Sequence, residues 1–336
     1  MSVATTFGDI SQRTAVYAEG KMLEYIHPII VLDNFGEVKP LPANSSDTIE
    51  FRRPVPFPIS LTQLQEGVTP APKRMRYEDV KVSMGEYGDL TEMSNRVEDF
   101  GEDPVLNDMV EALSRQIAET KERLTWAAII AGTNVFYSST TASPTSRTDV
   151  NAPIDLNIQR SITRSLKNQR AMKITRKLAA GPNFATEPVA PSYVAVCHSD
   201  CETDIRNLPG FVPVETYSGN SQLHDWELGK KEDVRYITSP VLVPWQSAGS
   251  TTLNGMTSTD GTNVDVYPIV YLSEKAFGTV PLRGPGSVSP WIENPGKRSK
   301  ADPLGQRGYA GWKMYFAALI LNEAWLVRAE VGATDL

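Results

Sequence analysis

Residues 46–98 contain two stretches in which apolar and polar side chains alternate, separated by a segment rich in proline. The apolar members of the alternation are Ile49, Phe51, Val80, Val82 and Met84. A period of two is typical of strands that are buried on one face only. The sequence therefore predicts a long two-stranded arm over residues 46–98.

The segment that joins the two predicted strands restricts how the arm can pair. Pro54, Pro56 and Pro58 alternate with other residues, and Glu66-Gly67 follows nearer the tip. Proline has no N–H group and cannot sit in a central strand, so the arm cannot widen into a sheet by itself. Because a lone hairpin is marginally stable in water, we expect the apolar face to be covered by another copy of the chain.

A basic cluster at Lys73, Arg74 and Arg76 faces Arg52-Arg53 on the other predicted strand. Such charges can prevent edge-to-edge aggregation, or contact DNA, but we favour ion pairs with acidic groups of a neighbouring subunit. The residues expected to contact a neighbouring subunit are Ile49, Phe51, Arg52, Arg53, Glu66, Lys73, Arg74, Arg76, Val80 and Val82.

The rest of the chain predicts a mixture of helices and strands. A helix about 40 Å long is expected over residues 103–131, where apolar residues recur with a period near 3.6 after Asp103-Pro104. Its expected outer face carries Glu111, Arg115, Glu119, Lys121, Glu122 and Arg123. Further helices are predicted at residues 13–25 and 156–172, and a short helix is predicted after Asp200 through Leu208. Strands are predicted at residues 192–197, 234–237, 264–272 and 309–327, the last of them broken near Asn322.

The composition narrows the classes of protein that fit. The 336 residues suffice for roughly two domains, and a net charge of −7 lacks the basic excess of proteins that grip phosphates. The N-terminus has no signal-peptide pattern, no apolar run approaches membrane-spanning length, and two cysteines do not make a disulfide framework.

The sequence contains few residues in patterns typical of catalytic, cofactor or metal sites. Cys197, His198 and Cys201 are the one cluster of metal-ligand types, but a second ligand pair is missing, so we interpret them as core cysteines around a turn. With three histidines in all and no phosphate-binding or nucleophile motif, we predict no catalytic residue, no cofactor and no metal site. The carboxylates Glu98-Asp99 and Glu102-Asp103 fit a turn and a helix start.

A series of short motifs resembles the major capsid proteins of tailed phages, in particular the family of the N4-like coliphage major coat proteins. The motifs are residues 6–11 (TFGDIS), 66–70 (EGVTP), 103–106 (DPVL), 131–137 (AGTNVFY), 147–151 (RTDVN), 204–207 (DIRN), 210–215 (GFVPVE), 266–268 (VYP) and 277–281 (FGTVP). The resemblance covers nearly the whole chain, and the series rather than any one motif carries it.

The resemblance implies an α+β chain with the Hong Kong ninety-seven phage capsid fold. Its parts would be an N-terminal arm (1–45), an extended loop (46–98), a peripheral domain (99–135 and 287–336) with a spine helix at about 103–131, and an axial domain (136–286). Such proteins form hexamers and pentamers of an icosahedral shell around double-stranded DNA. The alternatives are an encapsulin-like compartment of the same fold with a cargo enzyme, and an unrelated enzyme with a swapped hairpin.

The same resemblance implies the partners. We expect the chain to bind itself, a separate scaffolding protein, a portal and a decoration protein, and to enclose DNA without sequence-specific binding. No membrane contact is expected, and assembly would take place in the cytoplasm of the host bacterium. A separate scaffold is expected because the matching region starts within the first ten residues.

Overall fold

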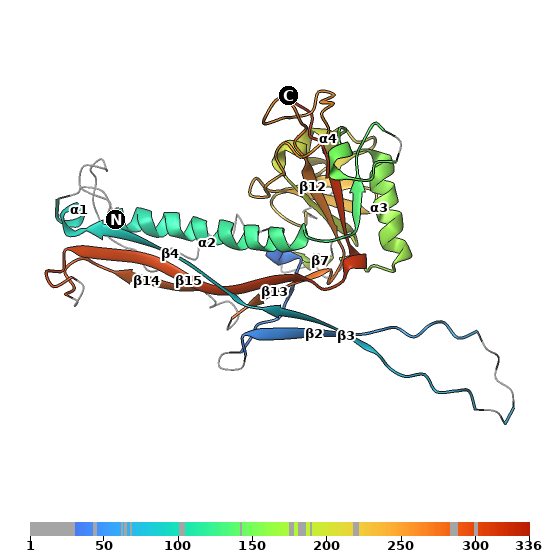
Figure 1. The fold of residues 1–336 in the computed structure, drawn as a ribbon, viewed down its shortest axis with the longest axis horizontal. Helices are drawn as coiled ribbons and strands as arrows, with labels where there is room; N and C mark the ends of the chain where they lie inside the picture. Colours follow the sequence, from blue (N-terminus) through green and yellow to red (C-terminus); the bar gives the residue numbers. More distant parts are fainter. Residues whose placement is uncertain are drawn as a thin grey trace.

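The computed structural model describes residues 31–42, 46–61, 63, 66–67, 69–100, 105–141, 143–174, 178–180, 186–188, 190–217, 222–282, 288–298 and 302–336. The helix expected at residues 13–25 and the Asp103-Pro104 helix start lie outside these residues. In Figure 1 a long helix lies along a narrow sheet, a compact body stands at one end of the helix, and an arm projects beyond the body.

The narrow sheet has five strands in the order β1 (Glu37–Val38), β13 (Phe277–Pro281), β15 (Arg307–Ile320) and β14 (Val288–Glu293), with β4 (Gly85–Ser94) also paired to β15. Alternate residues of β15, including Trp312, Met314 and Phe316, pack against Val110 and Ile117 of helix α2 (Val105–Ile129). The helix predicted at residues 103–131 is therefore confirmed over its described part, because its apolar stripe has this sheet to cover it. The short helix α1 (Asn95–Phe100) joins β4 to α2.

The body is built on a seven-stranded sheet with both faces covered. Its order is β5 (Val135–Tyr137), β16 (Leu326–Val331), β12 (Tyr267–Leu272), β8 (Tyr193–Cys197), β11 (Val234–Thr238), β10 (Glu227–Lys231) and β9 (Val212–Pro213). Helices α3 (Leu156–Asn168) and α4 (Glu202–Arg206) lie on one face. Trp126 and Ile129 of α2 pack on the other face, so the long helix belongs to both cores. Central strands covered on both sides are apolar at every position, which agrees with the observed burial of β8 and β12.

Smaller elements complete the described chain. They are β2 (Thr48–Pro54) paired with β3 (Tyr77–Ser83), β6 (Leu178–Ala180) paired with β7 (Thr186–Pro188), and the 3-10 helices Leu32–Asn34, Arg147–Asp149, Ser199–Cys201, Val214–Thr216 and Glu323–Trp325. No helix among the described residues is both long enough and apolar enough to cross a membrane.

The structure corrects the predicted bounds of the arm and confirms the predicted break near Asn322. The predicted arm of residues 46–98 is too long at its C-terminal end, because β4 leaves the hairpin and pairs with β15 from Gly85 to Ser94. The expected break near Asn322 is confirmed, since the Asn322 side chain caps a 3-10 turn there. The strand that follows, β16, lies in the seven-stranded sheet and not beside β15.

Candidate assembly surfaces

The arm root, formed by β2 and β3, rests on the chain's own narrow sheet. Ile49 lies opposite Val82 and Phe51 opposite Val80, so the apolar members of the two predicted strands share one face. Ile49 is buried, and the other three side chains pack with it against the face of β13 and β15 that α2 leaves free. At the root, the same chain therefore covers Ile49, whereas Phe51, Val80 and Val82 are only partly buried and their contacts with a second copy stay a prediction. Alternation shows that one face is covered, but it carries no information on which copy covers it.

The polar side of the arm root is neutralised within the arm. Arg52 Nε donates to Asp79 Oδ1 at 2.8 Å, and Arg53 Nε donates to Glu78 Oε2 at 2.7 Å. The hydrogen bond from Arg52 lowers the pKa of Asp79 from its ordinary value. The structure thus gives both arginines partners in the same arm. Contacts of Lys73, Arg74 and Arg76 with a neighbouring subunit stay a prediction.

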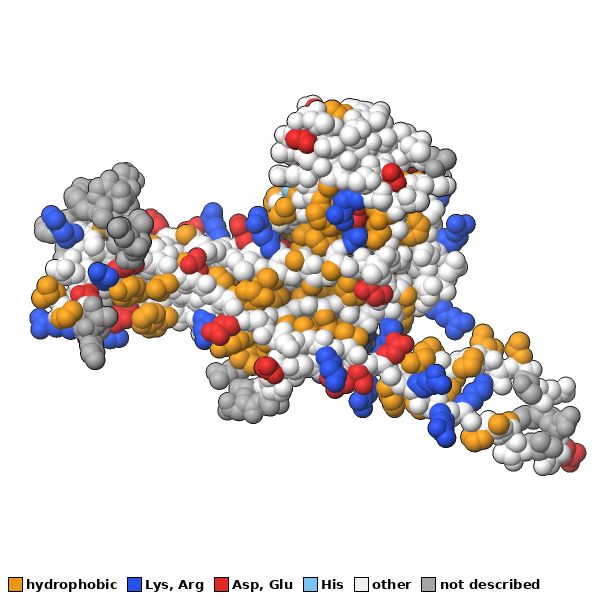
Figure 2. All heavy atoms as spheres, viewed as in Figure 1, with side chains coloured by type: hydrophobic (Ala, Val, Ile, Leu, Met, Phe, Trp, Pro, Cys, Tyr) orange, Lys and Arg blue, Asp and Glu red, His pale blue; other side chains and the backbone are white. Residues whose placement is uncertain are grey.

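The arm tip is the segment beyond Pro54 and Tyr77, where the described residues form no strand. Its root-side end is marked by the Val55 N–H, which donates to the Arg76 carbonyl at 2.9 Å. Large apolar side chains are exposed here: Phe57 (54%), Ile59 (72%), Leu61 (92%) and Met75 (47%). Figure 2 shows apolar side chains and basic groups mixed along the arm. Glu66 and the basic cluster are also exposed. Clustered apolar exposure on a projecting element marks an interaction surface.

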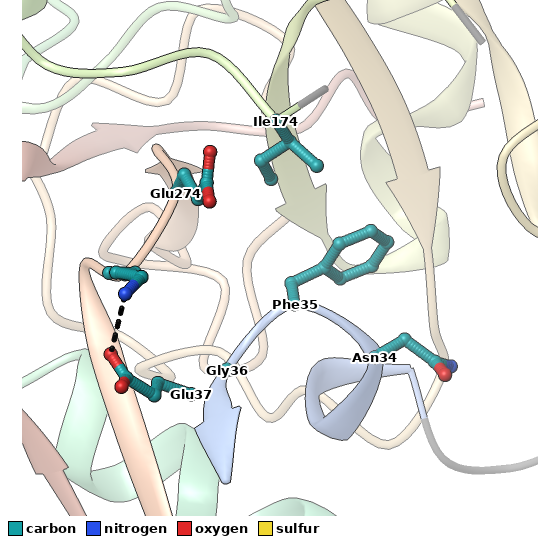
Figure 3. A pocket seen from close by; sticks show the side chains of 7 residues that line it. Asn34, Phe35, Gly36, Glu37, Ile174 and Glu274 are labelled. Atoms are coloured by element: carbon teal, nitrogen blue, oxygen red, sulfur yellow. Dashed lines mark ion pairs between the residues drawn. The ribbon is translucent and has the colours of Figure 1, made fainter. Parts of the chain in front are cut away.

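A cleft of about 790 Å³ lies between the arm root and the base of the body. Its apolar lining includes Phe51 and Val80 from the arm and Trp325 from the turn before β16. A smaller hollow of about 300 Å³ shares Glu37 and Lys275 with this cleft. Figure 3 shows this hollow between the Asn34–Glu37 segment, Ile174 and Glu274, with the dashed ion pair of Glu37 and Lys275, 3.9 Å apart, at its edge.

The N-terminal segment is fastened to the long helix through a buried carboxylate. Glu122 Oε1 accepts the backbone N–H groups of Val31 at 3.2 Å and Leu32 at 3.0 Å. The Glu122 side chain is therefore not on the outer face of α2, where the sequence analysis placed it, but buried. Burial raises its pKa to about 7. Beside it, Lys121 forms an ion pair with Asp33.

A second buried polar cluster joins the long helix to the body. Arg147 binds Glu330 through two hydrogen bonds of 2.7 and 2.9 Å, and its guanidinium lies 3.5 Å from the centre of the Trp245 ring. Arg328 forms a 2.9 Å ion pair with Glu330 and donates to the carbonyl oxygens of Ile130 and Gly132. These carbonyls follow the last turn of α2, where cations are favoured. Nothing in the local sequence pattern singles out this cluster.

The Cys197, His198 and Cys201 cluster sits where the core interpretation places it. Both cysteines are buried free thiols, and burial raises their pKa above the ordinary value, which keeps them protonated. The His198 Nδ1 accepts the backbone N–H of Asp200 at 3.2 Å, as in a turn. Within the described residues no three His, Cys, Asp or Glu side chains come together as metal ligands.

Comparisons with solved structures show the fold. The chain superimposes on the capsid of Ralstonia phage GP4 with a TM-score of 0.63 and 11% identity, covering 100% of this chain and 99% of that one. The capsid asymmetric unit of cyanophage Pam1 gives a TM-score of 0.61 at 11% identity, with 100% of both chains covered. The head structure of Helicobacter pylori bacteriophage KHP40 gives 0.59 at 12% identity, covering 99% and 95%.

Comparisons of sequence identify the family. The chain is 21% identical to the "Major capsid protein" of Pseudomonas phage KPP21 over 254 residues, and the match covers 71% of this chain. The match spans 64% of the length of that relative. None of these matches supports the encapsulin-like alternative. Residues 77–329, three quarters of the sequence, match the "Phage capsid protein" family. The chain therefore belongs to the phage capsid protein family.

Proposed function

We propose that this phage capsid protein is the major capsid protein, which self-assembles into hexamers and pentamers of an icosahedral shell around packaged double-stranded DNA. One observation carries the proposal: the arm tip projects from the body with Phe57, Ile59 and Leu61 exposed. An extended apolar arm gains nothing in an isolated chain, but it buries apolar surface when a second copy covers it.

The proposed fold is that of the Hong Kong ninety-seven phage capsid. The arm with β2 and β3 would be the extended loop, α2 the spine helix and residues 1–45 the N-terminal arm. The narrow sheet with α2 would form the peripheral domain, and the body the axial domain. Strand pairing favours moving β13 to the peripheral domain and β16 to the axial domain, relative to the expected boundaries of 136–286 and 287–336.

We extend the proposal to the partners and the subfamily. The motif series supports kinship with the N4-like coat proteins, and the net charge of −7 suits a container that encloses DNA without binding its sequence. A separate scaffolding protein, a portal and a decoration protein are the proposed partners, and the host cytoplasm is the proposed site of assembly. No catalytic role is proposed.

The test is to express the full chain in bacterial cells, with and without the scaffolding protein of the same phage. Size-exclusion chromatography and electron microscopy should then show closed shells built of pentamers and hexamers. A stable monomer at micromolar concentration, with residues 46–98 ordered, would contradict the assembly proposal. A cargo enzyme inside the purified shells would favour the compartment instead.

A further inference from the structure

We propose that the solvent-facing side of helix α3, with the turn that follows it, binds the phosphate backbone of the packaged double-stranded DNA. This inference rests on the proposed function, and it names the surface by which the shell touches its contents. Residues 156–178 hold seven basic side chains and no acidic one, in a chain whose net charge is −7. The described basic residues of this segment are together called the basic face: Arg160, Arg164, Lys167, Arg170 and Lys173.

The helix carries its basic residues in one row. Arg160, Arg164 and Lys167 are spaced by four and three residues, so they follow one another along one side of α3, and all three are exposed. The other side of α3, with Ile162 and Leu166, is buried in the core of the body. The helix lies on the face of the seven-stranded sheet opposite to the one that α2 contacts, at the outside of the body (Figure 1). The basic row therefore faces solvent in the isolated chain.

Two acids in the turn between β10 and β11 neutralise only part of this charge. Glu232 forms an ion pair with Arg160 at 2.6 Å, and Asp233 forms ion pairs with Lys173, at 2.8 Å, and with Lys167. The five basic residues of the face therefore keep an excess of three positive charges over these two acids. Arg164 and Arg170 are exposed and form no ion pair with another described residue, so their guanidinium groups are available to a partner.

The other long helix of this chain shows that a solvated helix face need not carry charges of one sign. Helix α2 has four acidic and three basic residues, whereas α3 has three basic residues and no acidic one. The helix dipole favours cations in the last turn, where Lys167 lies, but it does not explain Arg160, the fifth residue of α3. A row of one sign on an acidic protein creates a local positive potential, which attracts a partner of opposite charge.

The kind of side chain on this face favours phosphates over a protein partner. Besides the basic residues, the exposed positions of α3 are Asn157 and Asn168, whose amides also donate to phosphate oxygens. No large apolar side chain of α3 is exposed. Protein–protein interfaces usually have an apolar core, whereas interfaces with DNA are more polar and more basic. The row from Arg160 to Lys167 is about 10 Å long at the usual helix rise, which matches about three nucleotides of one DNA strand. Phosphate contacts carry no sequence information, as a shell that encloses a whole genome requires.

Photo-crosslinking in DNA-filled particles tests the contact directly. Arg164→Cys is introduced into the full-length chain of the phage, and purified particles are labelled with a thiol-reactive aryl azide. The native Cys197 and Cys201 are buried, so wild-type particles treated in the same way measure the background. Irradiation should attach the Arg164→Cys chain, and not the wild-type chain, to the phage DNA. Labelled particles whose DNA stays free of protein would overturn the proposed contact, as would cross-links to the scaffolding protein or to a second copy instead of DNA.

Salt-dependent binding provides the second measurement. The unassembled full-length chain is titrated against a short fluorescent DNA duplex of random sequence at several salt concentrations. Arg164→Gln with Arg170→Gln should weaken binding roughly tenfold at low salt, and it should reduce the slope of the logarithm of affinity against the logarithm of salt concentration by about two. Arg164→Lys with Arg170→Lys keeps the charge and should keep most of the affinity. The matched control, Arg115→Gln with Arg123→Gln, removes the same charge from exposed positions of α2 and should change binding less.

The outcomes separate this proposal from the proposed function. Equal affinities of the wild type and the α3 variant, or equal losses in the α3 and α2 variants, would overturn the DNA contact and leave the shell proposal standing. Wild-type protein that forms no shells would overturn the proposed function, and the contact with packaged DNA with it. The melting temperatures of all variants should match that of the wild type, because each change lies at an exposed position.

Discussion

Glu122 accepts the backbone N–H of Leu32 at 3.0 Å, across 90 residues of sequence. The bond fixes the end of the N-terminal segment to the long helix that spans both cores. The groups that act on the carboxyl are known: burial and Asp33 raise its pKa, while the two backbone N–H groups and Lys121 lower it. Because burial dominates, the pKa is about 7.

This carboxyl makes stability depend on pH. Its folded-state pKa lies above the ordinary value of 4.5, so the folded protein binds the extra proton between those values. The protonated Glu122 carboxyl contributes to the stability of the folded protein in full below its unfolded-state pKa, and this contribution is lost as pH rises through about 7. Glu122→Gln removes the titration, so the free energy of unfolding of the variant should gain up to about 3 kcal/mol relative to wild type between pH 4.5 and 8. Urea unfolding at several pH values measures this difference. Glu119→Gln, on the exposed face of the same helix, is the control, and parallel profiles for wild type and Glu122→Gln would contradict the prediction.

Glu330 is expected to be required for a stable junction between helix and body. Its side chain is fully buried between Arg147 and Arg328, so Glu330→Gln leaves the buried guanidinium of Arg328 and the partly exposed one of Arg147 without a carboxylate. We expect a loss of about 3 kcal/mol in the free energy of unfolding, measured by chemical denaturation. Arg160→Gln breaks an exposed ion pair with Glu232 and should cost less than about 1 kcal/mol. Equal losses of unfolding free energy in Glu330→Gln and Arg160→Gln would contradict the prediction that the buried ion pair matters more than the exposed one.

Ile49→Ala should loosen the arm root without unfolding the body. Ile49 packs on β13 and β15, and removing such a buried side chain costs about 2 kcal/mol or more. Hydrogen exchange should become faster in β2 and β3, while β8 and β12 keep their protection. Uniform loss of protection over the whole chain would show that the root is not an independent unit.

Changes at the arm tip should act on assembly alone. Phe57→Ser with Leu61→Ser removes apolar surface that is already exposed, so the melting temperature of the unassembled subunit should stay within experimental error. Shell yield should fall, because these side chains are proposed to be buried by a second copy. Normal shells from this variant, seen by electron microscopy, would argue against tip contacts.

Arg52 and Arg53 pair with Asp79 and Glu78 in the same arm, so reversing the two arginine charges is expected to affect the hairpin as well as assembly. Arg52→Glu with Arg53→Glu places two acidic side chains directly opposite Asp79 and Glu78, and the repulsion should loosen the hairpin itself. Adding Asp79→Arg and Glu78→Arg restores the cross-strand pairs with opposite polarity. If assembly recovers in the fourfold variant, the charges act within the arm. If assembly stays blocked, they meet fixed charges in a neighbouring subunit.

The sequence by itself determined the local elements. The period of 3.6 located α2, the period of two placed Ile49 and Val82 on the apolar faces of their strands, and the apolar runs located β8 and β12. Each of these signals is local, because a helix or strand repeats its covered face at a fixed spacing whatever covers it.

Only the tertiary structure decided which surfaces meet. The residues of β4 continue the hairpin in sequence, yet they pair with β15, and β15 and β16 separate into different sheets within a few residues. Glu122 follows the apolar spacing of Ala118 and Trp126, but an acid at such a position looks like a surface residue until the Val31 and Leu32 N–H groups are seen beside it. Side-chain spacing records that a face is buried, whereas the identity of the covering surface depends on contacts between residues far apart in the chain.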